Sequence, residues 1–143
     1  NVEESNDLTL DYSNLNSILL PIDKEDTLNN IEEQLATDKK YYTSLTKQLA
    51  GLGGKSIKTM VKRIMGYLFT DNILGFYSFN GRANKKKCFA NLLISKVIFS
   101  AVKSIKRLNN ESSTDEIEKY IKYHLIQAPF NIKKKEKRNV LVD

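Results

Sequence analysis

The sequence has few of the residues that staple small secreted proteins or bind structural metals. It contains one cysteine, one histidine, two prolines and no tryptophan in 143 residues. A single cysteine excludes an internal disulfide framework, and Cys88 with His124 supplies too few soft ligands for a structural zinc site. We therefore expect an intracellular protein, nuclear or cytoplasmic, in a reducing compartment.

Long apolar runs and catalytic constellations are also missing. No apolar stretch approaches the roughly 18 residues that can span a bilayer, and no signal peptide is visible, so we expect no membrane association. No Ser/His/Asp or Cys/His set can be assembled, and the basic part of the chain lacks the acids of a two-metal nuclease. We therefore expect a protein that is not an enzyme, with no cofactor, no metal and no small-molecule substrate.

The charges are divided unequally along the chain. The net charge is +6, but residues 1–38 carry ten acids and one lysine, whereas residues 39–143 carry 22 basic and seven acidic residues. Between Lys55 and Arg107 there are twelve basic residues and one acid, Asp71. An ordinary solvated surface mixes its signs, so this segment predicts an acidic partner, with nucleic acid as the first choice.

The apolar spacing predicts an all-α fold, a compact bundle of about five helices with a glycine-bearing loop before the longest helix. The expected helices span about 23–36, 38–50, 56–69, 87–108 and 114–127. Asp23 and Asp38 are typical N-caps, Gly51 is expected to end the second helix, and Pro129 is expected to end the last one.

These patterns divide the chain into three parts. They are an acidic N-terminal extension (1–20), a helical domain (21–128) and a basic C-terminal tail (129–143). The length suits one domain. Because the first residue is Asn1 and not methionine, we expect a module of a longer protein.

The segment from Asn80 to Lys87 is the main candidate site. Gly81 lets the backbone approach an anion, and Lys85–Lys87 lie near the start of the predicted long helix, whose free N–H groups attract anions. A basic turn exposed to solvent is the alternative interpretation. Basic faces of the neighbouring helices extend the site if they are coplanar with it. The predicted nucleic-acid contacts are Lys55, Lys58, Lys62, Arg63, Arg82, Lys85, Lys86, Lys87, Lys96, Lys103 and Arg107.

Aromatic residues lead into this segment. Phe76, Tyr77 and Phe79 could stack on bases, or they could belong to the core, as aromatics beside a turn commonly do. Tyr77 is the best candidate for exposure, because its hydroxyl suits a half-wet position. His124 falls on the inward stripe of the last predicted helix and is expected to pack there.

Three blocks of sequence resemble a catalogued domain of unknown function that is common in arthropod proteins. They are LLPI with IEEQL (19–22 and 31–35), LAGLGGKSIKTMVKRIM (49–65) and FNGRANKKKCFANLLISKVIFSAV (79–102). The resemblance implies no assigned activity. A weaker similarity, carried by Leu68-Phe69, Gly81 and Ile98, is to BEN domains, which are helical modules that bind DNA or mediate protein contacts in chromatin factors.

These observations favour a non-enzymatic nucleic-acid-binding module, with DNA preferred over RNA as the ligand. The alternative is a protein-interaction or self-association domain whose basic face meets an acidic partner. That partner could be another protein, or the acidic segment 1–38 of the same chain or of a second copy in a homodimer.

Overall fold

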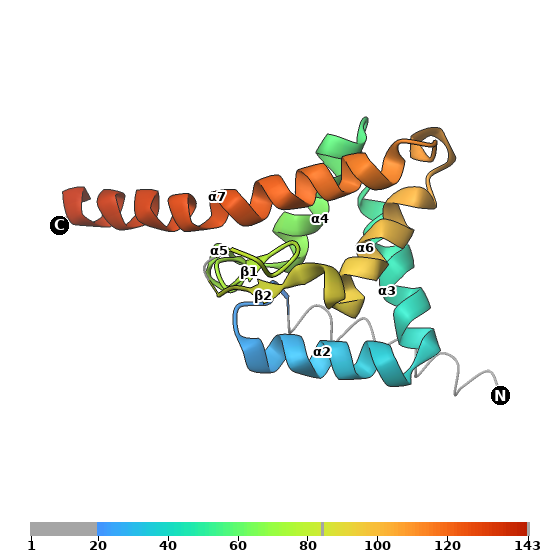
Figure 1. Ribbon diagram of the computed structural model, residues 1–143, viewed down its shortest axis with the longest axis horizontal. Helices are drawn as coiled ribbons and strands as arrows, with labels where there is room; N and C mark the ends of the chain where they lie inside the picture. The colour runs from blue at the N-terminus through green and yellow to red at the C-terminus, as the bar shows by residue number, and fades with distance from the viewer. Residues whose placement is uncertain (1–19, 84, 143) are drawn as a thin grey trace.

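The protein is a mainly helical domain, so the predicted fold class is confirmed. The computed structural model describes residues 20–83 and 85–142, and most of the expected extension 1–20 lies outside that range. Its elements are α2 (Glu25–Thr37), α3 (Lys39–Leu52), α4 (Ile57–Leu68), α5 (Asp71–Leu74), β1 (Tyr77–Ser78), β2 (Lys87–Cys88), α6 (Leu93–Lys103), α7 (Ser113–Val142) and single 3₁₀ turns at Phe89–Asn91 and Lys106–Leu108. Figure 1 shows α7 across one side of the molecule and α2 across the other, with α3, α4 and α6 between them.

One face of each of α2, α3 and α4 is apolar at intervals of three or four residues, and this face is buried. The predicted positions that it contains are Leu28, Ile31, Leu35, Tyr41, Leu45, Leu49, Ile57, Val61, Ile64 and Leu68. Burying each such side chain contributes about 1.5–3 kcal/mol, which is why the helices pack into one core. None of the helices in the described part of the chain is both long and apolar enough to cross a membrane.

The two predicted N-caps have different roles. Asp38 caps α3 and accepts two backbone N–H groups from its first turn, as predicted. Asp23 does not cap α2, which begins only at Glu25, so that prediction is wrong. The Asp23 carboxylate instead accepts hydrogen bonds from Thr70 (2.6 Å) and Asn72 (3.3 Å), and these bonds lower its pKa below the ordinary value. Asp23 therefore ties the start of the domain to the segment after α4.

The glycines after α3 end that helix later than predicted. Gly51 lies inside α3, and Gly53 is the residue that adopts a left-handed conformation, with φ of 58°. A Cβ atom on Gly54 would lie 2.7 Å from the backbone nitrogen of Met60 in α4. α3 ends where the backbone of Gly53 leaves the helical conformation, and glycine suits Gly53 by its positive φ and Gly54 by its close approach to α4. A side chain at Gly51 would meet open space.

The helix predicted over 87–108 exists only over Leu93–Lys103, so both of its predicted ends are wrong. Its first two residues form β2, a 3₁₀ turn follows, and α6 is only eleven residues long. The reason is Phe89, which is 1% exposed and lies edge-on to the rings of Phe69 (5.7 Å) and Tyr77 (6.2 Å). Packing of this ring between α4 and β1 outweighs the helical spacing of the segment around it.

A carboxylate from α2 caps the shortened α6. Glu32 accepts the backbone N–H of Leu93 at 2.7 Å and that of Ile94 at 2.8 Å. A helix begins with N–H groups that have no partner inside the helix, and a negative charge there also complements the helix dipole. Glu32 therefore fixes where α6 begins, although it lies 61 residues away in the sequence.

The helix predicted at 114–127 is much longer than expected. α7 runs through Pro129 and is the longest helix in the described part of the chain, so the prediction that Pro129 ends it is wrong. A proline inside a helix removes one backbone hydrogen bond, but α7 packs against α4 and α5 here. Asn131 donates to Asp71 of α5 at 3.4 Å, beyond the proline. The expected basic tail is thus the end of a helix, and Figure 1 shows it extending past the body of the domain.

We predict that Glu32→Ala lowers the free energy of unfolding by about 1–3 kcal/mol, because two N–H groups lose a charged acceptor. Urea unfolding followed by circular dichroism measures this loss. Glu33→Ala is the matched control: Glu33 is the exposed neighbour of Glu32, and a change within about 0.5 kcal/mol is expected. Equal effects of the two substitutions would show that the cap does not stabilise the fold.

Candidate nucleic-acid interface

The predicted anion-binding turn is not at a helix N-terminus. Residues 79–86 connect two parallel strands, and Lys85 lies in the turn with a φ of 61°. Gly81 has a φ of 72°, and a Cβ atom there would lie 2.9 Å from the Cβ atom of Cys88, so its role is geometric. The first N–H groups of α6 are already bound by Glu32. The expected contribution of helix N–H groups to this site is therefore wrong.

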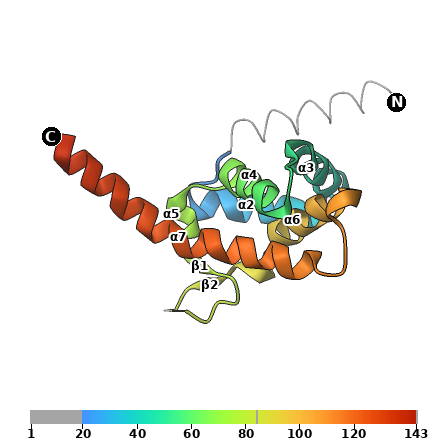
Figure 2. The same cartoon turned by 90° about the horizontal axis from the view of Figure 1, so that it is seen from above.

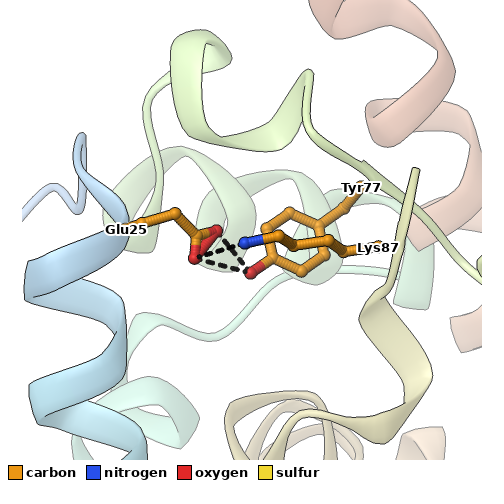
Figure 3. A network of polar contacts seen from close by, with 3 residues as sticks. All are labelled: Glu25, Tyr77 and Lys87. Atoms are coloured by element: carbon orange, nitrogen blue, oxygen red, sulfur yellow. Dashed lines mark hydrogen bonds and ion pairs between the residues drawn. The ribbon is translucent and has the colours of Figure 1, made fainter. Parts of the chain in front are cut away.

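Lys87 lies at the surface, where a polar network that Figure 3 shows holds its side chain, 61% exposed, beside Glu25. Its ammonium nitrogen lies 3.4 Å from Oε2 of Glu25, and the Tyr77 hydroxyl donates to Oε1 of the same carboxylate at 2.6 Å. Burial raises the pKa of Tyr77, and the hydrogen bond to Glu25 adds to this effect. Tyr77 is only 4% exposed, so its expected exposure is wrong; Phe76, at 59%, is the exposed aromatic.

Both predicted arginines near the glycine segment bind backbone carbonyl groups. Arg63 donates to the carbonyl oxygens of Leu52 (3.2 Å) and Gly53 (3.3 Å). Arg107 donates to that of Lys55 at 3.0 Å and to that of Gly54. The two guanidinium groups therefore hold the turn between α3 and α4, and this use competes with phosphate binding.

Helix α4 and the loop that joins β1 to β2 lie on opposite sides of α7, as Figure 2 shows. Lys58 and Lys62 line a groove of about 1070 Å³ together with Lys119, Tyr123 and other residues of α7. Acidic side chains of α7 also line this groove. The basic residues of α4 and of the loop thus lie on the two sides of α7, and Lys122 of α7 lines this groove as well as contacting the loop.

On the other side of α7, basic and aromatic side chains form a continuous chain of contacts. The ammonium group of Lys122 lies 5.5 Å from the ring centroid of Phe79, and this ring lies 6.5 Å from that of Phe99. The ammonium group of Lys103 lies 5.9 Å from the Phe99 centroid. Two cations from α6 and α7 are therefore held against a pair of aromatic rings at the base of the loop.

The loop completes a surface that we call the loop–α6 surface. Its cations are Arg82, Lys85, Lys86, Lys96, Lys103 and Lys122. Arg82 and Lys86 line a cleft of about 260 Å³ with Phe79 and Lys122, and none of the acidic residues that the structure describes lines it. Lys96 shares the exposed face of α6 with Lys103, one heptad away. The structure thus places five predicted site residues on this surface and adds Lys122, which sequence reasoning missed.

The signal for Lys122 was present but ambiguous. Lys119 and Lys122 interrupt the apolar spacing of the last predicted helix, which only shows that they are exposed. Their proximity to Phe79 or to α4 depends on how α7 packs. The contribution of Phe99 to this surface was missed for the same reason, because its contact with the Phe79 ring beside the loop depends on tertiary packing.

His124 lies on the α4 side of α7 and is half-buried, with its ring 5.3 Å from that of Tyr123 in an edge-to-face contact. Burial lowers the pKa of His124, the positive charge of Lys62 lowers it further, and Asp71 acts in the opposite direction.

In residues 20–83 and 85–142, no three His, Cys, Asp or Glu side chains are grouped closely enough to hold a metal ion.

We predict that the His124 ring titrates below the ordinary value of about 6.5, as followed by NMR of the chain's one histidine. Because the unfolded state then takes up the proton first, stability falls as the pH drops below about 6.5, until the folded pKa is passed. Lys62→Gln should raise the pKa of His124, and Lys96→Gln, which removes a charge that does not shift this pKa, should leave it unchanged. A titration at or above the ordinary value would contradict this placement.

Comparison with known proteins identifies the family but not an activity. The profile of a family described as a domain of unknown function, DUF4806, matches residues 14–102, which is more than half of the chain. The match contains the loop and nearly all of α6, and it ends before α7. No curated protein and no solved structure matches the chain. The chain therefore belongs to the DUF4806 family.

Proposed function

We propose that this domain is a non-enzymatic nucleic-acid-binding module and that DNA phosphates contact the loop–α6 surface. The observation that supports this most directly is the contact chain Lys103–Phe99–Phe79–Lys122, which places two cations and two rings beside a basic loop. Alternating cationic and aromatic side chains are typical of surfaces that bind phosphates and bases.

The charges on this surface are available to an outside ligand. Arg82 and Lys85 are exposed. Lys122 has an ion-pair partner, Glu118, at 2.7 Å, but both side chains are well exposed. Such a pair contributes only about 0–1 kcal/mol, so a phosphate group can replace the carboxylate at little cost. By contrast, Arg63 and Arg107 donate to backbone carbonyl groups, and we assign them to the fold and not to the interface. Lys87, whose side chain is 61% exposed and pairs with Glu25, stays a predicted contact.

Contacts of this kind position a nucleic acid and carry little sequence information. Each phosphate that is neutralised releases counterions, which gives an affinity that falls with salt concentration. Phe76 is exposed at the edge of β1 and is the aromatic side chain that we propose for stacking on an unpaired base. A DNA-binding role implies action in the nucleus, and the pattern-level similarity to BEN domains points the same way.

We predict that the triple variant Arg82→Glu, Lys85→Glu, Lys86→Glu loses at least tenfold affinity for random-sequence duplex DNA at low salt, since the loop no longer attracts phosphates. The slope of log affinity against log salt concentration should also fall, by about one for each phosphate that the variant no longer neutralises. Fluorescence anisotropy with labelled duplexes across a salt series measures both quantities.

The matched control is Lys39→Glu, Lys40→Glu, Lys47→Glu on α3, which changes the net charge equally at exposed positions away from the loop. Its affinity should fall much less. Equal losses in the two variants would mean that only the net charge attracts DNA. If the wild-type domain binds neither DNA nor RNA at low salt, the proposal is wrong and an acidic protein partner becomes the better hypothesis.

A further inference from the structure

The outer face of α7 carries an apolar stripe. Tyr123, Ile126 and Phe130 are 56%, 61% and 54% exposed. Their spacing of three and four residues places them on one side of the helix. The opposite side is buried in the core and contains Ile117, Ile121, Leu125 and Ala128. Three adjacent large apolar side chains at this spacing are typical of a helix face that packs on another helix.

The charges along α7 change sign from one end to the other. The first turns of α7 contain Asp115, Glu116 and Glu118, Lys119 and Lys122 follow them beside the stripe, and the segment after the stripe contains the basic run 133–138. With a rise of about 1.5 Å per residue, the 30 residues of α7 span about 45 Å. Figures 1 and 2 show the basic end extending beyond the body of the domain, where a partner can approach it.

We infer that a second copy of this chain covers the stripe, with the two α7 helices packed antiparallel about a twofold axis near Tyr123 and Ile126. In that arrangement the acidic end of each α7 faces the basic end of the other. Glu116 and Lys133 are equally distant along the helix from the midpoint of Tyr123 and Ile126, and so are Asp115 and Lys134. Each pair therefore meets twice across the axis, as a twofold interface requires.

Charge complementarity selects this partner over others. A wholly acidic partner, such as the N-terminal segment 1–19 with its four acids and no base, would face the acidic end of α7 unfavourably. A wholly basic partner would be repelled by the run 133–138. A parallel α7 pair would place like charges side by side. A helix whose charges run in the opposite order satisfies both ends, and a reversed copy of α7 is such a helix.

Sedimentation of the full 143-residue chain tests the inference. We expect a dimer at micromolar concentration that dissociates more readily as salt is raised, because the end contacts are ionic. Ile126→Glu should yield a monomer with an unchanged circular dichroism spectrum. Phe76→Glu, which changes a similarly exposed apolar residue outside α7, should leave the dimer intact. A wild-type monomer at every concentration and salt tested, or an Ile126→Glu dimer, would overturn the inference.

A charge exchange tests the antiparallel orientation. Lys133→Glu with Lys134→Glu should weaken the dimer at least tenfold, and so should Asp115→Lys with Glu116→Lys. Combining all four substitutions should restore the dimer, because every facing pair is again opposite in charge. This fourfold variant should not pair with the wild type. A folded fourfold variant that stays monomeric would refute the antiparallel arrangement.

Discussion

Two carboxylates on one face of α2 hold the acidic start of the domain to its basic half. Glu25 binds Tyr77 of β1 and Lys87 of β2, and Glu32 binds the first N–H groups of α6. They lie seven residues apart, so two helical turns bring them to the same side of α2. The strands that flank the loop and the helix that carries Lys103 are therefore positioned by one rigid element. The loop–α6 surface has its shape because these carboxylates fix both of its edges.

This arrangement changes the meaning of the uneven charge distribution along the chain. In residues 20–38, the acids include several that bind groups of the same domain: Asp23 after α4, Glu25 at the strands, Glu32 at α6 and Asp38 at α3. Part of the acidic segment is thus used to build the fold. The basic side chains greatly outnumber these acids, so a positive surface remains on the loop, on α6 and along α7.

The sequence predicted what depends on neighbours along the chain and missed what depends on neighbours in space. The buried stripes of α2, α3 and α4 and the Asp38 cap follow from local spacing, and these predictions are confirmed. The interruption of the predicted helix before α6 could not be predicted from local spacing. It depends on the contacts of Phe89 with two aromatic rings and on the hydrogen bond from Leu93 to Glu32, which lies 61 residues earlier in the sequence. The continuation past Pro129 depends on α4 and α5 packing beneath the helix. For the candidate site, charge alone indicated the loop and α6, whereas Lys122 joins them only through tertiary packing.

The contacts of Lys103 and Lys122 with aromatic rings have a consequence for the entropy of binding. A free lysine on a surface samples many rotamers, and fixing its side chain on an anion costs as much as about 2 kcal/mol of conformational entropy. Here the rings of Phe99 and Phe79 already restrict both ammonium groups in the folded protein. Part of that entropy is lost during folding and not during binding. Any anion that meets these two side chains therefore encounters a surface that is already organised to receive it.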